Sequence, residues 1–435
     1  MTDQSPLSIR GLEASTTALR VDMEIYGKAL ENIFHPKDNP DGVLLLNMAE
    51  NNLTWYLLKE KIESILQKEE IPHWVSNYTS SIGAPSFREA LANFLSRFLT
   101  LSPIKADHLA ASAGATPVVE ISSWILCNPG DVAVFPAPSY PVYTQDIGNK
   151  SAVERYDLIT HQEVEEIKAG PLVNIAHLES TKKIIEAQGK RFRMLVLTNP
   201  DNPTGGMYAF EDLLKITDWC LANNVHLIVN EIYGLSLIDT NHPDIKADYD
   251  RKIDFVSFAQ IMQDRQSDYL HLWYSLSKDI GSSGFRVGLV YSLNEQFLQA
   301  YMNLNAPHMV SNLTQWLFQQ VLSDHDFMTS YIAKNQRALT DSYALVVRYL
   351  KMAGIPYVPS RGSLFVWIDL SKWMSASTTE AETVLWLDLY EKTKVLITPA
   401  DGFGNTKRGQ YRLVYTAIAK EDLKVAMERL LNYFA

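Results

Sequence analysis

The stretch YSLSKDIGSSGFRVG spans residues 274–288 and places Lys278 directly after an apolar run that is typical of a β-strand. Small residues flank this lysine, so it can be buried at the edge of a sheet. Burial lowers the pKa of a lysine and makes its amine a nucleophile that can form a Schiff base. A surface lysine that ends a strand is the commoner alternative, and it stays open on this stretch alone.

Four further short runs share the apolar, barely alternating character of the run before Lys278. With that run included, the predicted strands are residues 132–135, 194–197, 226–229, 270–274 and 287–291. Such runs suit strands that are buried on both faces of a mostly parallel sheet. Helical patterns lie between them, for example at residues 117–126 and 210–223. This alternation predicts an α/β layer architecture.

The composition of the chain changes after about residue 304. A long helix, a strand and a final helix are expected there, at residues 312–352, 363–370 and 421–433. This pattern predicts a smaller α+β domain at residues 306–435, after a large domain at residues 71–305. Residues 1–70 would form an N-terminal arm and part of the small domain.

Composition and charge exclude several classes of protein. With 46% hydrophobic residues among 435, the chain can form a large core, which excludes a disordered protein. The formal net charge of −11 disfavours a nucleic-acid partner or an anionic membrane. The two cysteines, Cys127 and Cys220, are too few for a disulfide framework and indicate a reducing compartment. Because no apolar signal segment or membrane-length apolar run occurs, we expect a cytoplasmic protein without a membrane span.

Four polar segments besides the Lys278 stretch stand at positions where α/β proteins bind ligands. They are AGATP at residues 113–117, NPDNPTGG at 199–206, NEIY at 230–233 and QYR at 410–412. The first opens a helix, whose free N–H groups and dipole suit a phosphate. The second and third follow predicted strands, and the last carries an arginine that could clamp a carboxylate. Each also has a purely structural alternative, such as a turn or a surface salt bridge. The ten histidines show no metal-binding spacing, so no metal is expected.

In their order and spacing, the five segments resemble those of the fold type I pyridoxal-phosphate enzymes, the aspartate aminotransferase superfamily. Within it the chain resembles 1-aminocyclopropane-1-carboxylate synthase and its synthase-like relatives. MAENNL at residues 48–53 is similar to the synthase segment LAENQL, and residues 274–288 nearly reproduce the pattern YSLSKDxGxxGFRVG. The resemblance implies bound pyridoxal 5'-phosphate, a large domain of the seven-stranded kind, and an active site between the two domains at a dimer interface.

The resemblance also implies a role for each matching residue. Lys278 matches the Schiff-base lysine and general acid/base, and it is an expected catalytic residue together with Tyr233. The groups implied to hold the cofactor phosphate are Ser275, Arg286, Tyr78 and the backbone N–H groups of Ala115 and Thr116. Tyr78 would cross from one subunit to the cofactor of its neighbour, which implies a homodimer with shared sites.

Other matches concern the cofactor ring and the substrate. Tyr140 would stack on the ring, whereas Asn202 and Tyr233 would donate hydrogen bonds to its phenolic oxygen. Arg412 matches the residue that clamps the substrate α-carboxylate. Glu50 matches the synthase glutamate near the substrate.

The chain departs from the family pattern at three places besides Ala400, which replaces a glycine. Asn230 replaces an aspartate that pairs with the pyridinium nitrogen. A neutral amide can donate a hydrogen bond to this nitrogen, but it supplies no counter-charge, so the ring becomes a poorer electron sink. The gap between Tyr78 and Gly83 is longer than in plant synthases, and residues 140–145 lack a charged pair of those enzymes.

These observations predict a pyridoxal-phosphate-dependent lyase or synthase that eliminates or substitutes a group on an amino-acid side chain. Its substrate would be a small amino acid or a sulfonium compound, and its reaction a ring closure of the synthase kind, a carbon–sulfur cleavage or another cyclisation. An aminotransferase is the first alternative. A non-catalytic cofactor-binding homologue is the second; Asn230 favours it, and the intact residues Lys278, Asn202, Tyr233 and Arg412 disfavour it.

Overall fold

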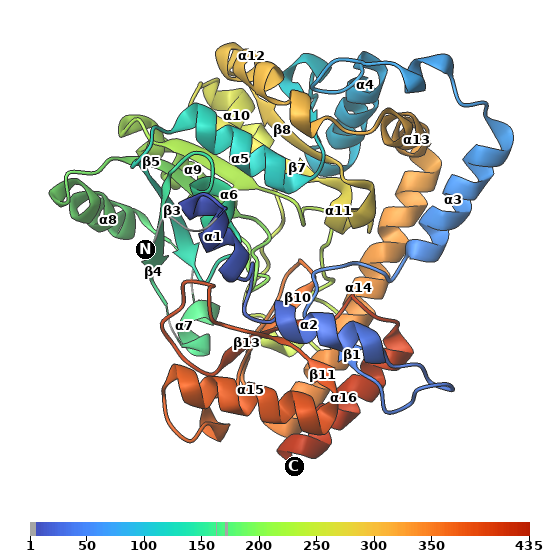
Figure 1. Ribbon diagram of the computed structural model, residues 1–435, viewed down its shortest axis with the longest axis vertical. Helices are drawn as coiled ribbons and strands as arrows, with labels where there is room; N and C mark the ends of the chain where they lie inside the picture. Colours follow the sequence, from blue (N-terminus) through green and yellow to red (C-terminus); the bar gives the residue numbers. More distant parts are fainter. Residues whose placement is uncertain (1–5, 162, 170–172) are drawn as a thin grey trace.

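The computed structural model describes residues 6–161, 163–169 and 173–435. A seven-stranded sheet with the order β2-β8-β7-β6-β5-β3-β4 lies at the centre of the large unit (Figure 1). Its strands are β2 (Leu109–Ser112), β3 (Val132–Ala137), β4 (Glu154–Ile159), β5 (Phe192–Thr198), β6 (His226–Asn230), β7 (Leu270–Ser275) and β8 (Gly288–Ser292). The strands from β4 to β7 pair in parallel, and β8 pairs antiparallel with both β7 and β2. The predicted mostly parallel α/β sheet is therefore confirmed.

Helices cover both faces of this sheet, which explains the absence of polar alternation in the predicted strands. Within β6, Ile228 packs on one face with side chains of α5 (Ala115–Leu126) and α12 (Glu295–Leu304). Its neighbours Leu227 and Val229 pack on the other face with α9 (Phe210–Ala222) and α10 (Phe258–Arg265). Successive apolar residues of β6 therefore enter two different cores.

Two strands of the large sheet escaped the sequence analysis. β2 reads LAAS, and alanine and serine carry little strand preference. β4 reads ERYDLI and lies at the edge of the sheet, where partly exposed polar side chains give the run a surface-like pattern.

A four-stranded sheet with the order β12-β13-β10-β9 forms the smaller unit. Its strands are β9 (Tyr357–Val358), β10 (Phe365–Asp369), β12 (Thr398–Pro399) and β13 (Gln410–Val414). Three helices accompany it: α14 (His325–Ala353), α15 (Thr379–Thr393) and α16 (Lys420–Phe434). Figure 1 shows α14 running from the large unit to the small one.

The long helix predicted over residues 312–352 is two helices. α13 (Asn312–Ser323) ends before Asp324, whose side chain caps α14 by accepting a hydrogen bond from the Phe327 N–H at 3.0 Å. The apolar spacing continues across this break, so periodicity alone did not reveal it. Gly354 then ends α14 in the left-handed conformation, with φ of 61°.

The N-terminal residues contribute to both units. β1 (Leu44–Leu45) pairs in parallel with β11 (Val395–Leu396), and Leu44 lies in the core of the small unit. The apolar side chains of α3 (Trp55–Lys68) lie instead in the core of the large sheet, as do those of α13. The domain boundaries at residues 70 and 305 stay predictions. Within the described ranges, every helix is too short or too polar to cross a lipid bilayer.

Candidate active site

A cavity of about 400 Å³ opens at the carboxyl ends of β5, β6 and β7, and Lys278 forms part of its wall. Lys278 belongs to the short helix α11 (Leu276–Asp279), which follows β7 directly. Its Nζ donates a hydrogen bond to the Ala49 carbonyl at 2.6 Å. Burial lowers the pKa of Lys278 to about 8, against the opposing charge of Glu50. The amine is therefore much closer to its nucleophilic neutral form than an exposed lysine would be.

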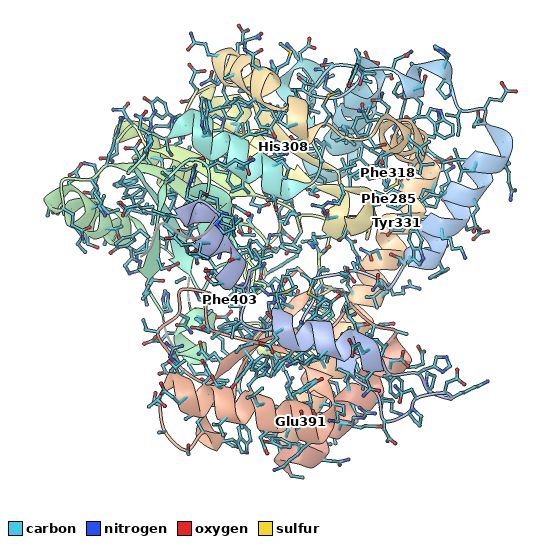
Figure 2. The ribbon with its side chains drawn as sticks, viewed as in Figure 1. Phe285, His308, Phe318, Tyr331, Glu391 and Phe403 are labelled. Carbon is cyan, nitrogen blue, oxygen red and sulfur yellow. The ribbon has the colours of Figure 1, made fainter. Side chains whose placement is uncertain are left out.

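The backbone around Lys278 is fixed from several sides. The Asn51 Nδ2 donates to the Lys278 carbonyl at 3.1 Å, and the Asp279 carboxylate accepts hydrogen bonds from the Leu235 N–H and the Tyr274 hydroxyl. The Tyr331 hydroxyl donates to the Ile280 carbonyl at 2.8 Å. Further along the loop, Phe285 packs edge-on against Phe318, with 5.1 Å between ring centroids (Figure 2). These contacts hold the lysine at one place in the cavity.

One end of the cavity is suited to an anion. Gly114 caps α5 with φ of 103°, and a Cβ at this position would lie 2.2 Å from the Arg286 Nη2. The guanidinium therefore lies against the start of α5, where Ala115 and Thr116 line the cavity. A helix N-terminus and an arginine together favour a phosphate.

The two serines before Lys278 differ in position. Ser277 lines the cavity. The Ser275 hydroxyl is fully buried, contacts the Ser277 hydroxyl at 2.8 Å and lies 2.6 Å from the Val287 carbonyl. Ser275 thus lies behind Ser277, and its role as a phosphate ligand stays a prediction. Sequence analysis did not single out Ser277.

Asn202 and Tyr233 meet on the cavity wall, as the resemblance implied for a shared function. The Asn202 Nδ2 lies 3.5 Å from the Tyr233 hydroxyl, and the turn that carries Asn202 is closed by Asp201 and Thr204. Burial raises the pKa of Tyr233 well above its usual value. Its phenol therefore stays protonated and can act as a hydrogen-bond donor.

Tyr140 also lines the cavity, and its backbone is held by an arginine that sequence analysis missed. Arg155, on the edge strand β4, donates to the carbonyls of Tyr140 and Pro141 at 3.0 Å each. It also donates to the Ser139 hydroxyl at 2.7 Å. The Arg155 side chain is only 6% exposed, but nothing in the polar run around it distinguishes it from a surface residue.

Arg412 contacts Asn202 from behind the cavity wall and is completely buried. Its Nη1 donates to the Asn202 Oδ1 at 3.1 Å, its Nη2 donates to the Asn47 carbonyl at 3.0 Å, and its Nε has no partner. Among the described residues, none pairs a carboxylate with it within salt-bridge distance. Burial and the charge of Arg20 lower the pKa of Arg412 to about 10. A buried cation with only neutral partners favours an anionic ligand.

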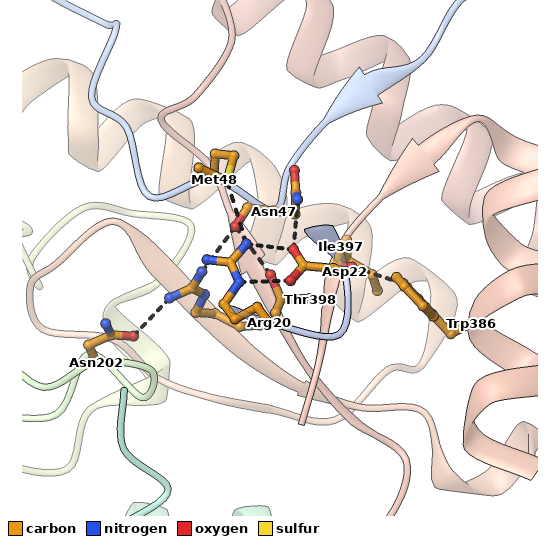
Figure 3. Close-up of polar contacts among 9 residues, drawn as sticks. Arg20, Asp22, Asn47, Met48, Asn202, Trp386, Ile397 and Thr398 are labelled. Atoms are coloured by element: carbon orange, nitrogen blue, oxygen red, sulfur yellow. Dashed lines mark hydrogen bonds and ion pairs between the residues drawn. The ribbon is translucent and has the colours of Figure 1, made fainter. Parts of the chain in front are cut away.

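Arg20 is a second arginine near this end, and sequence analysis did not find it. It lines the cavity and binds Asp22 through Nε at 2.7 Å and Nη2 at 2.5 Å (Figure 3). Asp22 is fully buried and also accepts a hydrogen bond from the Asn47 Nδ2 at 2.7 Å. The ion pair therefore fixes the N-terminal segment over the cavity. No motif in that segment signalled this role.

The two remaining predicted residues differ in location. Glu50 lines the cavity beside Ala49, on the side of Lys278. Tyr78 lies outside this cavity and is 99% exposed. Its reach into a neighbouring subunit stays a prediction.

The residues in the cavity fit the cofactor that the resemblance implies. An amine with a lowered pKa, a phosphate cradle that a Cβ on Gly114 would fill, and two neutral donors match the aldehyde, phosphate and phenolic oxygen of pyridoxal phosphate. In the part of the chain that the structure describes, no three histidine, cysteine or acidic side chains gather to hold a metal ion.

Comparisons with known proteins point to the same family as the sequence motifs. Residues 44–430 match the aminotransferase class I and II family. A 1-aminocyclopropane-1-carboxylate synthase of Glycine max is 28% identical over 93% of this chain and 82% of its own length. A similar synthase of Oryza sativa subsp. japonica is 30% identical, over 93% and 75%.

Solved structures share the fold. An archaeal alanine:glyoxylate aminotransferase superposes with a TM-score of 0.80, at 17% identity and over 98% of both chains. A mutant aspartate aminotransferase of Thermus thermophilus gives a TM-score of 0.77, at 19% identity and over 98% of this chain and 99% of the other.

Proposed function

This chain belongs to the aminotransferase class I and II family of pyridoxal-phosphate-dependent enzymes, and from this premise we propose that it is a lyase or synthase. It would eliminate or substitute a group on the side chain of an amino acid or a sulfonium compound. The similarity to 1-aminocyclopropane-1-carboxylate synthases supports this class of reaction. Carbon–sulfur cleavage and cyclisation both fall within it.

The observation that carries the proposal is the neutral amide of Asn230 at the end of β6, in the cavity wall. Pyridoxal phosphate, when bound, acidifies the Cα proton of the substrate by withdrawing electrons into its ring. Transamination must move that proton to the cofactor, which demands prolonged charge stabilisation at the ring nitrogen. A leaving group on Cβ can depart as the Cα electron pair forms a Cα=Cβ bond, and one on Cγ can be displaced as Cα bonds to Cγ and closes a ring; both lower the demand on residue 230.

The residues of this chain support distinct parts of such a reaction. Lys278, with its lowered pKa, would hold the cofactor and take the Cα proton through Nζ. Tyr233 would donate a hydrogen bond from its neutral phenol. Arg412 would clamp the substrate carboxylate in a bidentate pair, and Glu50 would lie near the rest of the substrate.

The phosphate end and the ring stacking follow the same logic. Arg286, Ser275 and the start of α5 would bind the phosphate. Tyr140, held by Arg155, would stack on the ring. Tyr78 would complete the phosphate site of a neighbouring subunit, so we infer a homodimer.

A product assay tests the proposed reaction class. The purified protein is incubated with S-substituted cysteines, sulfonium amino acids and common amino acids, with and without a 2-oxo acid. Release of the thiol or sulfide without a 2-oxo acid supports elimination or substitution. A new amino acid that forms only when a 2-oxo acid is present would make the aminotransferase alternative correct. No turnover of any substrate by protein with bound cofactor would favour a non-catalytic homologue.

A further inference from the structure

Asn230 is held in one orientation by two hydrogen bonds of opposite kind. Its Oδ1 accepts a hydrogen bond from the Ile232 N–H at 3.2 Å. Its Nδ2 donates to the Tyr143 hydroxyl at 2.9 Å. The side chain is 8% exposed, and both Asn230 and Tyr143 line the cavity.

Rotation of this amide by half a turn is unfavourable. It would place the Nδ2 against the Ile232 N–H, so that two donors would face each other and the backbone N–H would lose its acceptor. A buried polar group without a partner costs about 1–3 kcal/mol. The amide oxygen is therefore committed to the backbone, and the second hydrogen of Nδ2 remains for the cavity.

Tyr143 is rigid and uncharged, so it can define this orientation. Its ring stacks on Phe135 with 4.7 Å between centroids and meets Tyr140 edge-on at 5.4 Å. Burial raises the pKa of Tyr143 to about 12, although hydrogen bonds with Asn230 and Thr198 oppose the shift. The phenol oxygen is thus a neutral acceptor for the amide.

We propose that Tyr143 is a positioning residue that locks the Asn230 amide with an N–H toward the cavity, so that the site holds pyridoxal phosphate with an unprotonated ring nitrogen. A donor on the protein requires an acceptor on the ligand, and a pyridine nitrogen accepts only without its proton. This inference rests on the proposed cofactor site. It adds the protonation state of the ring and the residue that sets it.

The ionisable groups around Tyr143 do not replace the missing aspartate in this arrangement. Asp146, one turn later on α6 (Tyr143–Gly148), faces the cavity, and Glu120 of α5 lies behind it. Burial and the charge of Glu120 raise the pKa of Asp146 to about 7. Tyr140 and Tyr233 are further titratable neighbours, and burial raises the pKa of both. Asp146 is the carboxyl beside Tyr143 that lines the cavity, so it needs its own control.

Nitrogen-15 NMR of protein reconstituted with ring-labelled pyridoxal phosphate tests the inference without any substrate. The wild type should show a hydrogen-bonded, unprotonated ring nitrogen. Tyr143→Phe should move this resonance to the position of an unprotonated nitrogen without a hydrogen bond, and should weaken cofactor retention roughly three- to ten-fold. Tyr411→Phe is the matched control, because it also removes one buried phenol hydrogen bond, to the Glu382 carbonyl, away from the cavity. It should leave the resonance unchanged.

Two further variants decide the remaining outcomes. In Asn230→Asp the carboxylate can accept from both Ile232 and Tyr143, and the ring nitrogen should become protonated; this measurement stands even if Tyr143→Phe fails to fold. A protonated nitrogen in the wild type would overturn the inference, and its loss in Asp146→Asn would name Asp146 as the source. A Tyr143→Phe resonance equal to that of the wild type would also overturn it. All these results are independent of which reaction the product assay reveals.

Discussion

Replacing Arg412 by lysine keeps the positive charge but removes the planar fork of the guanidinium. In the structure the fork donates to Asn202 through Nη1 and to the Asn47 carbonyl through Nη2, and Nε is left without a partner. A lysine carries a compact ammonium on a flexible stem and cannot reproduce this planar arrangement. We therefore expect Arg412→Lys to lose one contact to the substrate carboxylate and to misplace the other.

The size of the effect follows from the kind of contact. A hydrogen bond to a charged group contributes about 1.5–3 kcal/mol, and burial of Arg412 keeps water from replacing it. The dissociation constant for an amino acid should therefore rise roughly 10- to 150-fold. Cofactor binding should change little, because Arg286 and the start of α5, which we propose to hold the phosphate, lie at the other end.

Amino-acid binding can be followed through the absorbance of the bound cofactor during titration. Arg193→Lys is the matched control, since Arg193 also donates to two neutral carbonyl oxygens, here the backbone carbonyls of Leu126 and Asn224, but lies outside the cavity. An amino-acid affinity in Arg412→Lys equal to that of the wild type and of Arg193→Lys would refute the clamp. So would a true substrate that has no free α-carboxylate.

Four further predictions concern the cofactor, the dimer, the ring and the core. Borohydride reduction should attach pyridoxal phosphate to Lys278, as read by peptide mass spectrometry; label on another lysine would reject its role. Mixed dimers of Lys278→Ala and Tyr78→Phe should regain activity, because one intact site forms in each hybrid, and proven exchange without recovery would argue against shared sites. Asn230→Asp should form more aminated cofactor per native turnover, and an unchanged ratio would show that Asn230 does not limit transamination. Finally, burial lowers the pKa of His226 to about 2 and that of His271 to about 3, so both stay neutral in the folded protein while the unfolded chain takes up protons below about pH 6.5. The free energy of unfolding should therefore fall as the pH drops below this value, by roughly 1.4 kcal/mol per pH unit for each histidine. Urea unfolding at several pH values should show that the free energy of unfolding depends less steeply on pH in His271→Gln than in the wild type. An equally steep dependence in both proteins would contradict the assignment.

Local signals in the sequence, together with the family resemblance, were enough to place several residues of the cavity. Lys278, Asn202 and Asn230 each lie at or just after the carboxyl end of a strand, and Ala115 and Thr116 open a helix. Such positions are set by short-range chain geometry, so a motif of a few residues can predict them. The apolar runs predicted the central strands because a strand also depends on residues that are close together in the sequence.

The missed residues depend on contacts between distant segments. The Arg155 side chain is covered only because the edge strand β4 lies beside the loop that carries Tyr140. Arg20 reaches the cavity only because Asp22 is buried against Asn47. The proposed role of Tyr143 depends on its hydrogen bond with Asn230, which lies far from it in the sequence. No pattern within a single segment encodes these pairings, so they required the structure.

The cavity reverses the overall charge of the chain. The sequence is acidic, with a net charge of −11, yet Arg20, Lys278, Arg286 and Arg412 gather around one small space. Their mutual repulsion contributes to the lowered pKa values of Lys278 and Arg412, because Arg412, Arg286 and Arg20 act on Lys278, and Arg20 acts on Arg412. An anionic phosphate at Arg286 and a carboxylate at Arg412 would relieve this repulsion and stabilise the folded protein by mass action. Asn230 and Tyr143 line the same cavity and are both uncharged, so in the proposed site the positive charge would act on the two anions of cofactor and substrate and not on the ring nitrogen. An elimination with a good leaving group requires this separation of charge. The cofactor phosphate and the substrate carboxylate must be bound tightly, whereas the ring needs little added charge stabilisation.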